Sequence, residues 1–165
     1  MRENTTPMHP RAATFVAQAR EEYGFDPAVT EFSEGTKTAA DAAAAIGCEV
    51  AQIASSLAFD ADGDLIVTIT SGANRVDEAA LADHLEVSPD DVEMAEPERI
   101  KSRLGWAIGG VPPICHDLPV PTLLDETLLE FETVWAAAGT PSAVFPVDPV
   151  ELERLTNADV VAVAE

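Results

Sequence analysis

Apolar residues recur at helical spacing in several separate stretches of the chain. An amphipathic stripe predicts a first helix over residues 10–23. Further helices are expected where Thr38, Asp77 and Asp148 stand as N-cap residues before apolar or alanine-rich stretches. A fifth helix is expected to begin at Pro97, because proline is well tolerated in the first turn of a helix.

Stretches rich in apolar and β-branched residues predict strands between these helices. The clearest pair is joined by Asp62-Gly63, a dipeptide typical of a two-residue hairpin turn. The expected strands cover residues 29–32, 53–59, 65–70, 122–125, 131–138, 143–147 and 160–163. Because helices and strands are interleaved, often through short turns, the pattern favours an α+β fold with a mixed sheet over a doubly wound parallel sheet.

One domain is expected over residues 1–165, with residues 1–7 frayed, since no repeat or linker divides the chain. The sequence has only two cysteines, no apolar signal core at its start and no apolar run of the roughly 20 residues that span a membrane. These features predict a reduced cytoplasmic compartment and no membrane insertion.

The charge balance is strongly acidic, with 30 Asp and Glu against 9 Lys and Arg and a net charge of −21. The acidic residues are spread along the chain rather than gathered in a tail. In dilute buffer such self-repulsion destabilises a compact fold, and concentrated salt screens it. We interpret the acidic residues as a solvated surface suited to a high-salt cytoplasm. The alternative is an interaction protein with a basic partner.

The most informative candidate for chemistry is the loop Gly109-Gly110-Val111-Pro112-Pro113. Its glycines allow a ligand to approach the backbone closely, and its prolines fix the shape of the loop. The N–H groups of such a loop could bind a carbonyl oxygen or an oxyanion, although a tight structural turn is an equally good interpretation. On the first interpretation, Gly110→Val is expected to abolish activity and leave the fold intact.

Other polar residues each allow a functional and a structural interpretation. Ser55 interrupts an apolar row, so it either lines a pocket or bonds nearby backbone. Asp125 ends an apolar strand and could act as a base, orient a loop or cap a turn. Asn74-Arg75 follows a strand, and Arg75 could contact a phosphate or form a surface salt bridge.

Cys115-His116 adjoins the glycine loop, but no second pair at zinc spacing accompanies it, so no metal is expected. The sequence also lacks a phosphate-binding glycine signature, a nucleophile elbow and a basic stripe. We therefore expect no cofactor and no binding to DNA.

Several stretches taken together resemble the YbaK/EbsC family, which is related to the editing insertion of bacterial prolyl-tRNA synthetases. They occur in the family order over about residues 30–165. The stretches are residues 38–43, 52–57, 71–77, 109–113, 124–126 and 138–140. Any one of them would be weak, and the ordered set is fairly specific.

The resemblance implies a mostly antiparallel, barrel-like sheet flanked by helices, and trans-acting hydrolysis of mischarged aminoacyl-tRNA. The partner would be the acceptor end of the tRNA, and the protein would be a monomer or a homodimer. The catalytic residues implied are Gly109, Gly110, Val111 and Asp125. The substrate-binding residues expected are Ser55, Ser56, Asn74, Arg75, Pro112, Pro113 and His116.

Ser55 departs from the family pattern, because many members carry a lysine at this place. A non-catalytic module that binds aminoacyl-tRNA or an amino acid is therefore the alternative. The chemistry remains coherent without the lysine, since an aminoacyl ester is an activated bond. Backbone N–H groups could hold the oxyanion, and the vicinal ribose hydroxyl of the substrate could transfer the proton.

Overall fold

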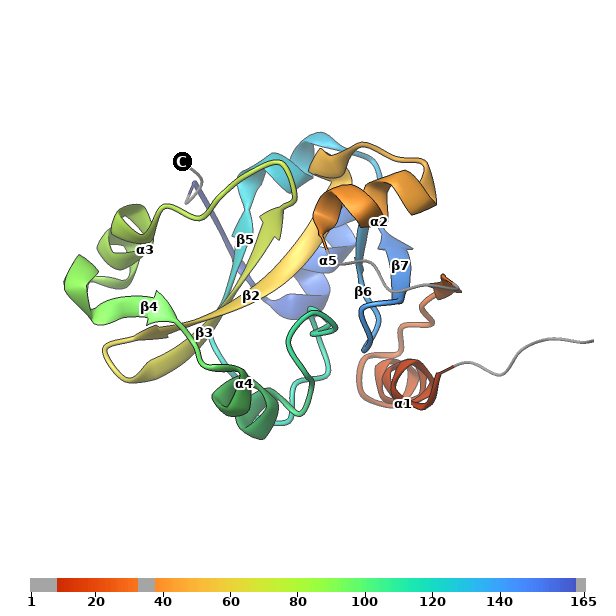
Figure 1. Cartoon of the computed structure of the whole chain (residues 1–165), viewed down its shortest axis with the longest axis horizontal. Helices are drawn as coiled ribbons and strands as arrows, with labels where there is room; N and C mark the ends of the chain where they lie inside the picture. The colour runs from red at the N-terminus through yellow and green to blue at the C-terminus, as the bar shows by residue number, and fades with distance from the viewer. Residues whose placement is uncertain (1–8, 33–37, 163–165) are drawn as a thin grey trace, which may run out of the picture.

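A computed structural model describes residues 9–32 and 38–162. Within these ranges the chain forms one sheet with five α-helices packed around it (Figure 1). The frayed end expected at residues 1–7 lies outside the described residues. No helix in the described ranges is long and apolar enough to cross a membrane.

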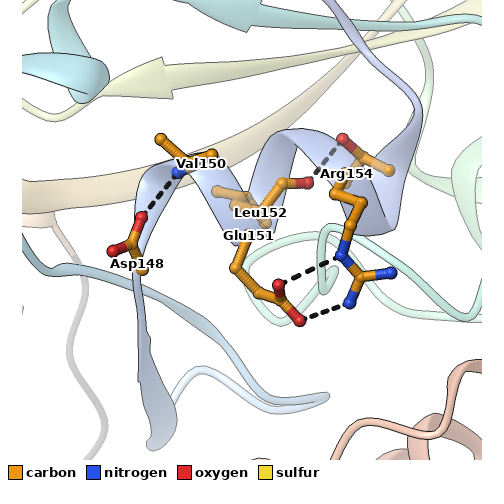
Figure 2. A network of polar contacts seen from close by, with 6 residues as sticks. Asp148, Val150, Glu151, Leu152 and Arg154 are labelled. Carbon is orange, nitrogen blue, oxygen red and sulfur yellow. Dashed lines mark hydrogen bonds and ion pairs between the residues drawn. The ribbon is translucent and has the colours of Figure 1, made fainter.

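Three helices begin at the N-cap residues that the sequence predicts. They are α2 (Ala39–Ile46), α3 (Glu78–Leu85) and α5 (Pro149–Thr156). The side chains of Thr38, Asp77 and Asp148 each accept a hydrogen bond from a backbone N–H in the first turn. Figure 2 shows the Asp148 cap of α5, together with an ion pair between Glu151 and Arg154 on the same helix.

The two remaining helices end at glycines with positive φ. α4 (Pro97–Leu104) is followed by Gly105, whose φ is 85°. The helix predicted over residues 10–23 is α-helical only in α1 (Pro10–Gln18) and continues as a π-helical turn, η1 (Ala19–Tyr23). The expectation of one regular helix is therefore corrected in its last turn.

The sheet is mixed, which confirms the α+β class. Its strands are β1 (Thr30–Glu31), β2 (Ile53–Ala61), β3 (Asp64–Ser71), β4 (Val92–Met94), β5 (Thr122–Asp125), β6 (Val134–Ala137), β7 (Ala143–Val147) and β8 (Asp159–Val161). The order is β1-β7-β6-β2-β3-β5-β8, with β4 also paired to β2. Four of the seven pairings are antiparallel, namely β1–β7, β2–β3, β2–β4 and β6–β7.

The β2–β3 hairpin is the longest pairing and the centre of the sheet (Figure 1). Its turn residues Asp62 and Gly63 have φ values of 52° and 89°, as a type I′ turn requires. Ladder partners run without interruption from Ala54 opposite Ser71 to Ala61 opposite Asp64. The predicted hairpin is confirmed, and this regular register determines which edge each β2 backbone group faces.

Short elements between the main ones were not anticipated from the sequence. They are β4 and three 3₁₀ turns, η2 (Val50–Gln52), η3 (Pro89–Asp91) and η4 (Glu126–Glu130). The strand predicted over residues 131–138 begins only at Val134. The residues before it form η4, which Asp125 starts by accepting a hydrogen bond from Thr127 N–H.

Apolar side chains are buried on both faces of the sheet. The larger cluster includes Phe15, which contacts the rings of Trp106 and Phe145 at centroid distances of 6.2 and 5.1 Å. A second cluster contains Leu81 of α3, which packs with Phe59 and other buried side chains. These two clusters fix β2 and β3 in place and leave one edge of β2 for the candidate site.

Candidate active site

The edge of β2 that faces away from β3 has two different partners. Residues 53–54 pair with β6 in parallel, and residues 59–61 pair with β4 in the antiparallel sense. Between them, residues 55–58 have no ladder partner on this edge within the described ranges. One backbone bond remains, from Ala95 N–H to the carbonyl of Ala58, at 3.0 Å. β6 and β4 thus leave a gap along the middle of β2.

A cavity of about 270 Å³ opens at this gap. Its walls come from α2, β2, α4, β6, β7 and the loop after α4. Most of the lining is aliphatic, including Ile53, Leu57, Ile100, Val111 and Val144. Such a cavity suits one small organic group whose orientation is determined by a few polar contacts.

The loop over residues 109–113 is irregular, as predicted, and two side chains hold it in place. Trp106 Nε1–H donates to the carbonyl of Cys115 at 2.8 Å. His116 Nε2 lies 2.8 Å from the carbonyl of Pro112 and must donate to it, since a carbonyl only accepts. Burial lowers the pKa of His116, which favours the neutral imidazole with its proton on Nε2.

The two glycines of the loop have different surroundings. Gly109 lines the cavity together with Val111. Gly110 instead donates its N–H to Ala107 at 3.0 Å, and a Cβ built on it would lie 2.7 Å from Thr140 Cα. The expectation that Gly110→Val leaves the fold intact is therefore wrong, because the added side chain would collide with backbone. Within the described residues, the N–H groups of Gly109 and Val111 have no hydrogen-bond acceptor.

Ser55 and Ser56 line the same cavity, from the unpaired stretch of β2. Both residues are half-buried. The Ser56 hydroxyl oxygen is buried and has no hydrogen-bond partner. A buried hydroxyl without a partner is uncommon in folded proteins and calls for an explanation.

Asp125 lies elsewhere, with β3 between it and β2. Its side chain is buried and accepts from Ser71 N–H at 3.1 Å, Asn74 Nδ2 at 2.9 Å and Thr127 N–H at 3.0 Å. Neither Asp125 nor Asn74 is among the residues that line the cavity. Arg75, beside them, is exposed. Asp125 and Asn74 thus fasten the turn after β3 to the end of β5.

The structure therefore separates the predicted site residues into three places. Ser55, Ser56, Gly109 and Val111 meet around the cavity. The second group does not line the cavity, and its members are Gly110, Pro112, Pro113 and His116. The third group is Asp125 with its partner Asn74, and the exposed Arg75 follows Asn74 in the chain.

Several cavity residues were missed from the sequence. Met94 and Ile108 are 50% and 52% exposed and contribute to the lining. Trp135 on β6 is half-buried and also lines the cavity, as does Thr140 in the turn before β7. The sequence contains a weak signal for Thr140, because the turn at residues 138–140 is one of the stretches that resemble the family. The alternation of apolar and polar residues could not predict that the strand with Trp135 pairs with β2.

The described lining of the cavity is uncharged. Its lining, in the part of the chain that the structure describes, contains no Asp, Glu, His, Cys, Lys or Arg. Burial raises the pKa of Cys115 to about 12, so this thiol is protonated at neutral pH. Among the same residues, no three His, Cys, Asp or Glu side chains lie close enough together to hold a metal ion.

A family model for the aminoacyl-tRNA editing domain matches residues 33–155. The uncharacterized protein YwhH of Bacillus subtilis is 31% identical over 131 residues, which cover 78% of this chain and 80% of YwhH. A proline–tRNA ligase of Lysinibacillus sphaericus is 28% identical over 103 residues, covering 62% of this chain and 18% of the ligase.

A solved structure supports the same relationship at the level of the fold. The crystal structure of a "putative trans-editing enzyme for prolyl tRNA synthetase" superposes with a TM-score of 0.89 at 40% identity. The match covers 96% of this chain and 99% of that one. The fold is thus that of an editing-type domain. The chain belongs to the aminoacyl-tRNA editing domain family, which confirms the resemblance seen in the sequence.

Proposed function

We propose that this protein hydrolyses the ester bond of mischarged aminoacyl-tRNA in trans, in the cytoplasm. The observation that carries the proposal is the cavity itself. Gly109 and Val111 of the glycine loop and Ser55 and Ser56 of β2 line this one cavity. Family membership makes an aminoacyl group the natural occupant of this space.

The size of the cavity favours one aminoacyl group over a nucleotide. Pockets for drug-sized ligands usually measure about 300–1,000 Å³, and this one is about 270 Å³. The terminal nucleoside would therefore rest at the rim. The half-buried ring of Trp135 gives a surface there on which a base can stack.

The chemistry proposed needs no ionisable protein side chain. Water attacks the ester carbonyl, and the N–H groups of Gly109 and Val111 hold the oxyanion that develops. One such donor typically contributes about 3–4 kcal/mol to the transition state. The vicinal ribose hydroxyl of the substrate takes a proton from the attacking water and gives its own proton to the leaving ribose oxygen, so that the free amino acid and the uncharged tRNA result.

The surface charge leads us to expect an unusual dependence on salt. Among the described cations, Arg20, Arg99 and Arg154 are paired with carboxylates. Lys101 and Arg103 lie on α4, which also contributes Ile100 to the cavity wall. Few cations are thus available for tRNA phosphates, whereas the net charge of −21 repels tRNA at low salt. Deacylation should increase from dilute buffer towards molar salt.

The test is a deacylation panel of mischarged tRNAs at several salt concentrations, with the fold followed by circular dichroism in parallel. Release of at least one amino acid, faster at molar salt, supports the proposal. Failure to hydrolyse any member while the protein is folded would overturn the enzymatic function. Activity that falls steeply with salt in the folded protein would instead reveal an ordinary basic tRNA site.

A second candidate is a binding module without catalysis, favoured by Ser55 at the place of the family lysine. A non-hydrolysable analogue, in which an amide replaces the ester, separates the two. Binding of the analogue without turnover of the ester would support the module. Ser55→Lys should then strengthen binding of the tRNA acceptor end, because it adds a cation at the cavity wall.

A further inference from the structure

The unpaired stretch of β2 presents backbone acceptors to the cavity in a defined pattern. The carbonyl of Ile53 accepts from Gly72 N–H at 2.7 Å, next to β3. The carbonyl of Ala58 accepts from Ala95 N–H at 3.0 Å, on the opposite edge. Backbone groups two residues apart in a regular strand face the same edge. The carbonyl and N–H of Ser56 therefore face the gap, as Ala58 does.

Ser56 combines this free backbone edge with an unpartnered side chain. Its hydroxyl is buried and makes no hydrogen bond. Because no bond holds it, rotation about χ1 to another staggered position loses no interaction. Such a rotation can direct the oxygen to a group placed at the gap. Ser56 can thus offer two neutral oxygen acceptors, its carbonyl and its hydroxyl, to one ligand.

We propose that Ser56 binds the α-ammonium group of the aminoacyl ester through these two oxygens, which rests on the proposed function. An ammonium group has three N–H donors and needs acceptors when it leaves water. The described lining of the cavity contains no carboxylate, so neutral oxygens must take this part. The ammonium group would donate to the Ser56 carbonyl at the open edge of β2, in the way that a residue of a neighbouring strand donates its N–H.

This arrangement predicts selectivity for a free amino group. An N-acetyl group removes the positive charge and two of the three donors. The protein should therefore deacylate aminoacyl-tRNA at least tenfold faster than its N-acetylated form. Deprotonation of the amine removes the positive charge and one N–H donor and so weakens both hydrogen bonds. Affinity for the amide analogue should therefore fall as pH rises through the pKa of its amine, near about 8.

The experiment compares wild type, Ser56→Ala, Ser56→Thr and the exposed control Ser102→Ala on matched free-amine and N-acetyl substrates. Ser56→Ala should reduce kcat/KM about tenfold for the free amine and hardly at all for the N-acetyl form. Ser56→Thr keeps the hydroxyl and should restore the preference, and Ser102→Ala should behave as wild type. Binding of the amide analogue and of its N-acetyl form is measured in parallel.

Equal losses of Ser56→Ala on both substrates would overturn the proposal, as would no loss on either. If Ser56→Ala lowered kcat/KM only for amino acids with a side-chain hydroxyl, Ser56 would contact the side chain of the substrate rather than its ammonium group. If wild type binds the amine analogue selectively but hydrolyses no ester, the ammonium site stands and the proposed hydrolysis fails. If hydrolysis occurs without any preference for the free amine, the hydrolysis stands and the ammonium site fails.

Discussion

Two buried polar groups, Asp125 and Ser56, have opposite surroundings. The carboxylate of Asp125 accepts three hydrogen bonds and is 1% exposed. The hydroxyl of Ser56 makes none and belongs to a residue at a cavity wall. Both belong to the stretches that resemble the editing family. The fold thus satisfies the hydrogen bonding of the Asp125 carboxylate and leaves the Ser56 hydroxyl without a partner.

The two groups are nonetheless linked through the sheet. Asp125 binds the N–H of Ser71, and Ser71 is the ladder partner of Ala54. Ala54 is the last β2 residue paired with β6 before the gap. Asp125 therefore supports the edge of β2 where the gap begins, without lining the cavity itself. A residue near a site can thus matter only because it maintains the shape of the site.

The largest loss of stability is expected from removing the fully hydrogen-bonded carboxylate of Asp125. Asp125→Ala leaves three buried or half-buried donors without an acceptor and should lower the free energy of unfolding by about 3 kcal/mol. Asp148→Ala is the matched control, because it removes an exposed N-cap and should lower it by only about 1 kcal/mol. Urea unfolding in molar salt measures both. An Asp125→Asn variant with unchanged stability and no deacylation would contradict the structural assignment.

A smaller loss of stability is expected from a substitution in the glycine loop, residues 109–113, which contributes to the same cavity as Ser56. Gly110→Ala places a Cβ against the backbone of Thr140 and should lower the free energy of unfolding by about 1–3 kcal/mol. The displaced loop should also slow deacylation at least tenfold. Gly63→Ala, with φ at +89° and no atom near its Cβ, is the control. It should lower stability through backbone strain and leave the deacylation rate unchanged. Equal activity in both variants would contradict the role of the loop.

Removing the Ser56 hydroxyl, which has no hydrogen-bond partner, should change the free energy of unfolding only slightly and in the opposite direction. Ser56→Ala eliminates a buried hydroxyl without a partner and should raise the free energy of unfolding by up to about 1 kcal/mol. Ser71→Ala is the matched serine control. The Ser71 hydroxyl donates to the carbonyl of Ala51 at 2.8 Å, so its loss should destabilise the protein. Destabilisation by both substitutions would show that Ser56 has a structural partner after all.

The smallest effect concerns His116 behind the loop. Its pKa is lowered by burial, so below the ordinary value of 6.5 the unfolded chain binds more protons than the folded one. The free energy of unfolding should therefore fall as pH decreases below about 6.5. His116→Gln should lose this part of the pH dependence. Thermal unfolding between pH 5 and 7.5 measures it, with exposed His84→Gln as control, and identical slopes in all three proteins would refute the assignment.

Much of the fold could be predicted because the signals are local. Thr38, Asp77 and Asp148 cap their own helices, and Asp62-Gly63 makes its own turn. The short strand β4 escaped prediction because it is stabilised by pairing with β2, far away in the sequence. The 3₁₀ turn after Asp125 also escaped prediction, although its cap at Asp125 is local. The π-helical turn after α1 also has no local sequence signal.

The sequence by itself determined the helix starts, the central hairpin, the irregular glycine loop and the family to which the chain belongs. The tertiary structure alone decided where the cavity lies, because the gap in β2 exists only where β6 and β4 stop short of one another. It also decided that Asp125 is saturated and Ser56 is not. Hydrogen-bond partners such as Ser71 and Asp125 are 54 residues apart, and no local pattern specifies which distant donors meet an acceptor.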